Sequence, residues 1–157
     1  MEVKGVLYED FVNYKKPSML VMFPKCDFKC DRECGSPVCQ NSALARGDSY
    51  LVSASQLVNN YMENDFTSAL VCAGLEPFDT FKELRLLINL FRTQTDDDIV
   101  IYTGYTEEEI QHYLDKLKFQ ENIYIKFGRY IPGQQPHYDE VLGVYLASDN
   151  QYGKKVS

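Results

Sequence analysis

Four of the five cysteines in this chain fall within the fourteen residues from Cys26 to Cys39, directly after the apolar run 19–23. The apolar run predicts a buried strand. The cysteine segment is then a loop at the carboxyl end of a strand, which is where open α/β sheets and barrels build their sites. Thiols packed this densely are typical of a chain that holds a metal ion or an iron–sulfur cluster, because both select thiolate ligands.

Three kinds of site are compatible with these thiols. The spacing favours an iron–sulfur cluster. A structural zinc site is the main alternative, since four cysteines can close a tetrahedron, but paired zinc knuckles use two Cys-x-x-Cys units and neither pair here has that spacing. Disulfides are the third, although small disulfide scaffolds usually carry more cysteine and a secretory leader. Cys72 lies in the apolar run 69–73 and is predicted to be a core residue.

Length and charge narrow the class of protein. A chain of 157 residues predicts a single domain, Met1–Ser157, which is too short for a complete eight-unit barrel of about 250 residues. The net charge of −7 and the lack of a basic run argue against a nucleic-acid partner. No apolar run approaches the length of a membrane span and the first residues lack a signal core, so we expect a cytoplasmic protein with no membrane partner.

Strand-like and helix-like segments alternate along the chain. Strands are predicted at Ser18–Phe23, 68–73, Asp98–Tyr102, Ile123–Phe127 and about 141–146. Helices are predicted at 55–62 with Ser53 as N-cap, at 80–91 with a Thr80–Glu83 capping box, and at 106–117 with a Thr106–Glu109 capping box. This order predicts an α/β fold, either a compact partial (βα) barrel or an open parallel sheet of about five strands with flanking helices. The tail 152–157 is expected to be solvated.

The loops after parallel strands meet at one rim of a sheet, so they are predicted to form one surface. These loops contain Gly74-Leu75-Glu76-Pro77, Thr103-Gly104-Tyr105, Gly128-Arg129 and Ser148-Asp149-Asn150-Gln151. Glycines let a backbone approach a ligand closely, and Glu76 can accept a bond from an ammonium group. Each loop alone is explained more simply as a turn, with Glu76 as a solvated acid. Together, beside the thiols, they favour a cofactor pocket.

The ordered motifs resemble the radical S-adenosylmethionine (radical SAM) enzymes, and most closely the anaerobic ribonucleoside-triphosphate reductase activating protein family, which are glycyl-radical enzyme activases. The matching stretches are Cys26-Asp-Phe-Lys-Cys30, Cys39-Gln-Asn41, Gly74-Leu75-Glu76-Pro77, Tyr102-Thr103-Gly104-Tyr105 and Asp149-Asn150-Gln151. The resemblance covers roughly residues 17–152. It implies a [4Fe-4S] cluster and S-adenosyl-L-methionine as cofactors.

The resemblance also implies roles for single residues. Only Cys39 carries the downstream asparagine of the family pattern, so the implied cluster ligands are Cys26, Cys30 and Cys39, with 31–38 as an insertion. Cys34 remains open as a spare thiol, a fourth ligand or the third ligand. The chain departs from the family at Leu75, in place of a second glycine, and at Phe127, in place of an aspartate. The implied cofactor-binding residues are Phe28, Asn41, Ala73, Gly74, Glu76, Tyr102, Thr103, Gly104, Asn150 and Gln151.

The function implied is an oxidoreductase that cleaves S-adenosyl-L-methionine and generates a glycyl radical on an anaerobic ribonucleotide reductase. Its electron donor would be a protein such as flavodoxin or ferredoxin. A small partial barrel leaves its site open on one side, which suits a macromolecular substrate that supplies its own wall. The alternatives are a radical SAM enzyme that modifies another protein or peptide, and a non-catalytic zinc-binding interaction module.

Overall fold

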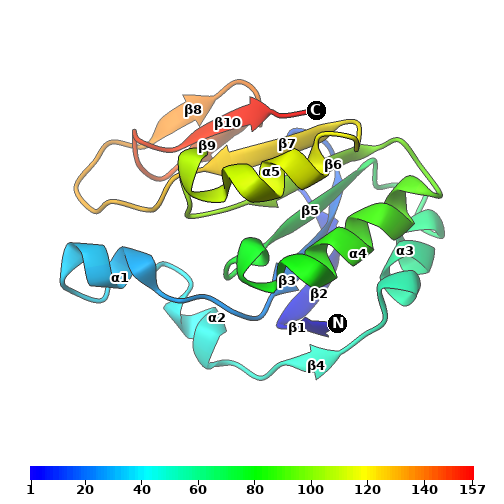
Figure 1. Ribbon diagram of the computed structural model, residues 1–157, viewed down its shortest axis with the longest axis horizontal. Coiled ribbons are helices and arrows are strands. Elements are labelled where there is room, and N and C mark those ends of the chain that lie inside the picture. Colours follow the sequence, from blue (N-terminus) through cyan, green and yellow to red (C-terminus); the bar gives the residue numbers. More distant parts are fainter.

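The computed structural model describes residues 1–157 and contains an open six-stranded mixed sheet with order β10-β7-β6-β5-β3-β2 (Figure 1). The four central strands run parallel: β3 (Ser18–Phe23), β5 (Ala69–Gly74), β6 (Asp98–Tyr102) and β7 (Ile123–Phe127). The two edge strands run antiparallel to their neighbours: β2 (Gly5–Asp10) pairs with β3, and β10 (Tyr152–Lys155) pairs with β7. Two small antiparallel sheets pair β1 (Glu2–Val3) with β4 (Tyr50–Leu51), and β8 (His137–Asp139) with β9 (Val144–Leu146).

The helices are α1 (Lys29–Cys34), α2 (Ser42–Arg46), α3 (Ala54–Met62), α4 (Phe81–Arg92) and α5 (Gln111–Leu117), with 3₁₀ turns η1 (Pro77–Thr80) and η2 (Glu108–Ile110). The Ser53 cap is confirmed, because its hydroxyl accepts the Gln56 N–H at 3.0 Å. The Thr106–Glu109 box is also confirmed by two reciprocal bonds of 2.8 and 3.4 Å. The prediction of a Thr80–Glu83 capping box is wrong, because the side chain of Thr80 makes no capping hydrogen bond. The 3₁₀ turn η1 already turns the chain before α4 begins.

The two faces of the sheet are covered unequally. Residues of α3, α4 and α5 pack on one face, where they form the larger core with alternate strand residues such as Leu70 and Ile99 (Figure 1). The other face carries a smaller core in which Val71 and Val100 pack under Tyr14, Leu142 and Leu146. The helices α3, α4 and α5 contribute no residue to this smaller core, and a cavity lies on this face near the carboxyl ends of the parallel strands. Cys72 is fully buried in the larger core, as predicted.

The α/β class is confirmed, but the sheet is mixed rather than parallel. The segment 141–146 is not a fifth parallel strand, since Val144–Leu146 pairs only with β8. The tail is an ordered edge strand, since β10 pairs with β7 and Tyr152 lies opposite Phe127. The expected solvation is confirmed for Tyr152, Lys154 and Lys155, which are exposed in this strand. The tail completes the edge that β7 would otherwise expose. No helix in the structure has the length and apolar character needed to cross a membrane.

Candidate iron–sulfur site

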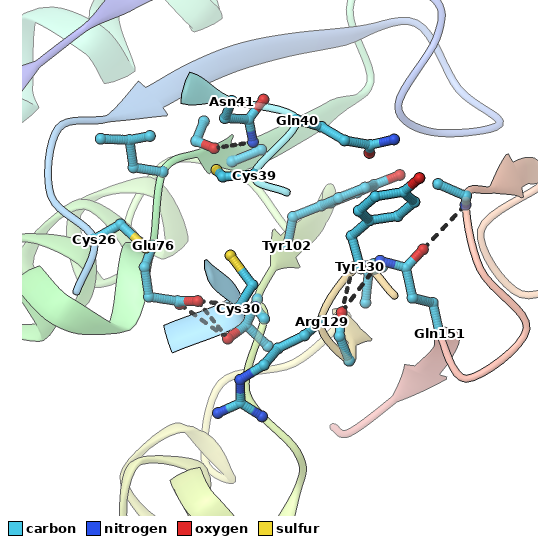
Figure 2. Close-up of a pocket in the computed structure, with 18 of the residues that line it drawn as sticks. Cys26, Cys30, Cys39, Gln40, Asn41, Glu76, Tyr102, Arg129, Tyr130 and Gln151 are labelled. Carbon is cyan, nitrogen blue, oxygen red and sulfur yellow. Dashed lines mark hydrogen bonds between the residues drawn. The ribbon is translucent and has the colours of Figure 1, made fainter. Parts of the chain in front are cut away.

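A cavity of about 440 Å³, here called the rim cavity, lies where the parallel strands end, on the sheet face opposite α3, α4 and α5 (Figure 2). The predicted site residues that line it are Cys26, Cys30, Cys39, Asn41, Ala73, Gly74, Glu76, Tyr102, Thr103, Gly104 and Gln151. Phe28, Cys34 and Asn150 are not among the lining residues. The fold therefore brings together one thiol-bearing loop and the ends of β5 and β6.

The three thiols reach the rim cavity through one folded-back loop. Cys26 follows β3, and Cys30 lies in α1. Cys39 is brought back to the cavity because the Asp31 carboxylate accepts the N–H groups of Val38 and Cys39, both at 2.8 Å. Burial raises the pKa of Cys26 to about 12. Burial, followed by the nearby Cys39 thiol, raises the pKa of Cys30 to about 11. These thiols therefore favour their neutral form until a cation offsets their charge.

The spread of the sulfur atoms distinguishes between kinds of metal group. The three cavity thiols do not all lie within 4.8 Å of one another. Four sulfurs around one zinc ion at Zn–S distances of about 2.3 Å would be about 3.8 Å apart. Cys34 is exposed and outside the cavity, so it adds no fourth thiol there. The donor set in the cavity is thus three thiols without a fourth, and three thiolate ligands fit an iron–sulfur cluster that keeps one iron free of protein ligands.

Phe28 contributes its backbone rather than its ring. Its φ of 54° is unusual for a bulky residue. Its backbone N–H donates to the Cys26 sulfur at 3.3 Å. Cys26 also lies within 4.8 Å of ligand oxygens of Asp27 and Asp79. The Asp79 carboxylate already accepts two hydrogen bonds, from the Asp27 N–H at 3.0 Å and from the Tyr105 hydroxyl at 2.7 Å.

Glu76 is buried, with 5% of its surface exposed, so its interpretation as a solvated surface acid is wrong. Its carboxylate accepts the Thr103 hydroxyl at 2.9 and 3.0 Å and the Gly104 N–H at 2.9 Å (Figure 2). It also accepts the Phe78 N–H at 3.2 Å. Burial raises the pKa of Glu76 to about 7, against the effect of these bonds. Glu76 therefore joins the ends of β5 and β6 and presents a fixed acid to the cavity.

Position 74 requires a glycine, because the backbone of a neighbouring strand packs closely against it. Its φ is +90°, and a Cβ atom there would lie 2.9 Å from the Met22 Cα. Its carbonyl accepts the Asn41 side-chain amide at 2.7 Å, which ties the end of the cysteine segment to the rim (Figure 2). Gly74 thus makes the turn that was predicted for it, and its carbonyl also holds the cysteine segment against the end of β5.

Tyr102 and Lys126 lie side by side on the sheet face that forms the cavity floor. The Tyr102 hydroxyl donates to the Asn13 carbonyl at 2.7 Å. Lys126, which sequence reasoning missed, is buried and its ammonium donates to the Gly128 carbonyl at 2.7 Å. Burial lowers the pKa of Lys126 to about 8. The alternation of Tyr124 and Lys126 with apolar neighbours along β7 was a signal that both side chains face away from the helices.

Asn150 and Gln151 fasten the chain before β10 to the loop after β7. The Gln151 side chain accepts the N–H groups of Ala147 and Ser148 at 3.0 and 3.2 Å and donates to the Gly128 carbonyl at 3.2 Å. The Asn150 side chain donates to the Arg129 carbonyl at 2.9 Å. Their implied role in binding a cofactor stays a prediction.

Comparison with known proteins agrees with the donor set. The family model described as "4Fe-4S single cluster domain" matches residues 18–138, which includes β3, the four-cysteine segment and most of the rim. No curated protein and no solved structure matches the chain significantly. Because the matched residues make up well over half of the chain, the protein belongs to the 4Fe-4S single cluster domain family.

Proposed function

We propose that this protein is a radical SAM activase, with a [4Fe-4S] cluster held by Cys26, Cys30 and Cys39. The observation that carries the proposal is that these three thiols share one cavity with Glu76 and the end of β6, while Cys34 stays outside it. Three thiolates on a four-iron cluster leave one iron without a protein ligand. When bound, this cluster would supply the electron that cleaves S-adenosyl-L-methionine to methionine and a 5′-deoxyadenosyl radical.

The rim residues would bind and orient S-adenosyl-L-methionine. Glu76 would accept a charge-assisted bond from the ammonium group, in a carboxylate position already fixed by Thr103 and Gly104. A cation at that point also favours the ionised form of Glu76, whose pKa burial has raised to about 7. Lys126 on the floor would offer its buried ammonium to an anionic group. Tyr102 and Gly104 would line the adenosine side.

The substrate proposed is a macromolecule. The rim cavity lies on the sheet face opposite α3, α4 and α5, and one of its sides is the thiol segment, which contains no buried residue. A protein partner that supplies the missing wall would exclude water from the radical. The resemblance described above points to the glycine loop of an anaerobic ribonucleotide reductase, with a flavodoxin or ferredoxin as electron donor.

The test is an anaerobic assay of the protein reconstituted with iron and sulfide. With dithionite as reductant, we expect S-adenosyl-L-methionine to be cleaved slowly to 5′-deoxyadenosine and methionine. Addition of the reductase should produce an oxygen-sensitive doublet glycyl-radical signal in electron paramagnetic resonance. Cleavage without that signal would transfer the proposal to another protein or peptide substrate. A protein that binds zinc and takes up no cluster would instead support an interaction module.

A further inference from the structure

The helix that carries Cys30 is not held in place by apolar packing. Helix α1 contains no buried residue, and Figure 1 shows it projecting beyond the strand ends, apart from α3, α4 and α5. A short helix without a buried face gains little stability of its own. Its orientation therefore depends on polar contacts with the rest of the protein.

Four charges of alternating sign supply those contacts. Lys29 and Glu33 belong to α1, Glu109 belongs to η2, and Arg129 follows β7. The Glu109 carboxylate accepts bonds from Lys29 and, at 2.7 and 2.9 Å, from the Arg129 Nη2 atom. The Arg129 Nε atom lies 3.4 Å from a Glu33 carboxylate oxygen. Lys29 and Glu33 thus each meet a partner on the body of the protein, whereas the other two charged residues of α1, Asp31 and Arg32, bond within the cysteine segment itself.

The Arg129–Glu109 pair at the centre of this network is better shielded from solvent than an ordinary surface pair, while Lys29 and Glu33 on α1 are 35% and 51% exposed. The Arg129 and Glu109 side chains are 12% and 27% exposed. The Tyr105 ring lies 5.6 Å from the Arg129 guanidinium and 6.0 Å from the Lys29 ammonium, so both cations also contact an aromatic ring. The Arg129 bond, together with those from Lys29 and Thr106, lowers the pKa of Glu109 to about 2. Glu109 is therefore ionised throughout the neutral range.

We propose that Glu109 is a positioning residue for the cluster: through Lys29, and through Arg129 to Glu33, it holds α1 so that Cys30 faces the rim cavity. The proposal rests on the proposed function in one respect, namely that Cys30 is a cluster ligand. Loss of the Glu109 charge should let α1 move, and a ligand on a mobile helix releases its metal faster.

Glu109→Gln is the informative variant. The glutamine keeps a side-chain oxygen for the Thr106 N–H, now 2.8 Å from Glu109, so the capping box is preserved while the charge is lost. Glu107→Gln is the matched control, because it lies two residues away and loses only the surface pair with Lys154, at 2.6 Å. Lys29→Gln is a second variant that removes the same contact from the side of α1.

The first measurement uses the iron-free protein. We expect amide hydrogen exchange of residues 29–34 to become roughly fivefold faster in Glu109→Gln and in Lys29→Gln, the order expected for loss of a partly exposed charged pair. In the wild type the exchange should also speed up between about 0.05 and about 0.5 M salt, and in Glu109→Gln, which keeps the Arg129–Glu33 pair, it should speed up less. Glu107→Gln should behave as the wild type.

The second measurement is the rate at which a chelator removes iron from the reconstituted protein, which should show the same order of variants and the same salt dependence. Exchange and iron-release rates in Glu109→Gln that equal those of Glu107→Gln would overturn the positioning role. Faster exchange of α1 in Glu109→Gln, combined with no cluster uptake by any form of the protein, would support the hold on α1 and refute the proposed function instead.

Discussion

The two sides of the rim cavity are built in different ways. The rim side, at the ends of β5 and β6, consists of buried residues such as Ala73, Glu76 and Thr103 joined by short hydrogen bonds. The thiol side contains no buried residue anywhere from 25 to 53. The difference indicates that the fold forms the rim by itself, whereas the thiol side gains its final order from the group that it binds.

The largest expected effect falls on the rim side. Gly74→Ala would place a Cβ atom 2.9 Å from the Met22 Cα at a φ of +90°, so we expect a loss of about 3 kcal/mol or more in unfolding free energy. Denaturant unfolding of the iron-free protein measures it. Gly133→Ala is the control, since its φ is +82° but no atom lies within 4 Å of the new Cβ, and its cost should stay near 1 kcal/mol. Equal costs for the two variants would refute the close packing at Gly74.

A second effect on the rim side is a pH dependence. Burial raises the pKa of Glu76 in the folded protein to about 7 from 4.5, so the folded state binds this proton more tightly than the unfolded chain does. The Glu76 contribution to stability is thus greatest below pH 4.5 and falls as the pH rises towards about 7. In Glu76→Gln the unfolding free energy should change less over this range, while Glu107→Gln should keep the wild-type slope.

Glu76→Gln also tests ligand binding. The reconstituted variant should keep its cluster but bind S-adenosyl-L-methionine about tenfold more weakly, because a neutral amide replaces a charged acceptor. Calorimetry on the loaded protein measures the affinity. An unchanged affinity would remove Glu76 from the binding site and leave it as a link between β5 and β6.

A smaller effect on the fold is expected on the thiol side. Asp31→Ala removes the acceptor of the Val38 and Cys39 N–H groups, yet the unfolding free energy of the iron-free protein should change by less than about 0.5 kcal/mol. Iron loss from the reconstituted protein should become about tenfold faster, because a group that orients a ligand is missing. Asp48→Ala, at an exposed position further along the same segment, is the control. A large loss of stability in Asp31→Ala would contradict the difference between the two sides.

The central strands and most helices could be predicted because their signals are local: apolar runs for β3 and β5, and caps such as Ser53 for α3. The strand β10 could not, since Gly153, Lys154 and Lys155 carry no strand pattern and pair only because β7 offers a free edge. The segment 141–146 is apolar for a different reason, because Leu142 and Leu146 cover the second face of the sheet.

The same division applies to the site. The thiol loop could be predicted from its spacing and from the strand before it. The burial of Glu76 could not, because it depends on Thr103 and Gly104, which are close only after β5 and β6 pair. The charges that meet α1 likewise come from Glu109 and Arg129, far along the chain, and no spacing rule connects them with Cys30.

The most direct test of the account compares single cysteine variants after anaerobic reconstitution. We expect Cys26→Ala, Cys30→Ala and Cys39→Ala to lose a stable four-iron cluster and the formation of 5′-deoxyadenosine, while Cys34→Ala retains most of both. Iron content and product are measured in the same samples. A Cys34→Ala protein without iron beside a Cys39→Ala protein that keeps it would contradict the ligand assignment. A fully loaded wild type that binds S-adenosyl-L-methionine and forms no 5′-deoxyadenosine would contradict the proposed chemistry.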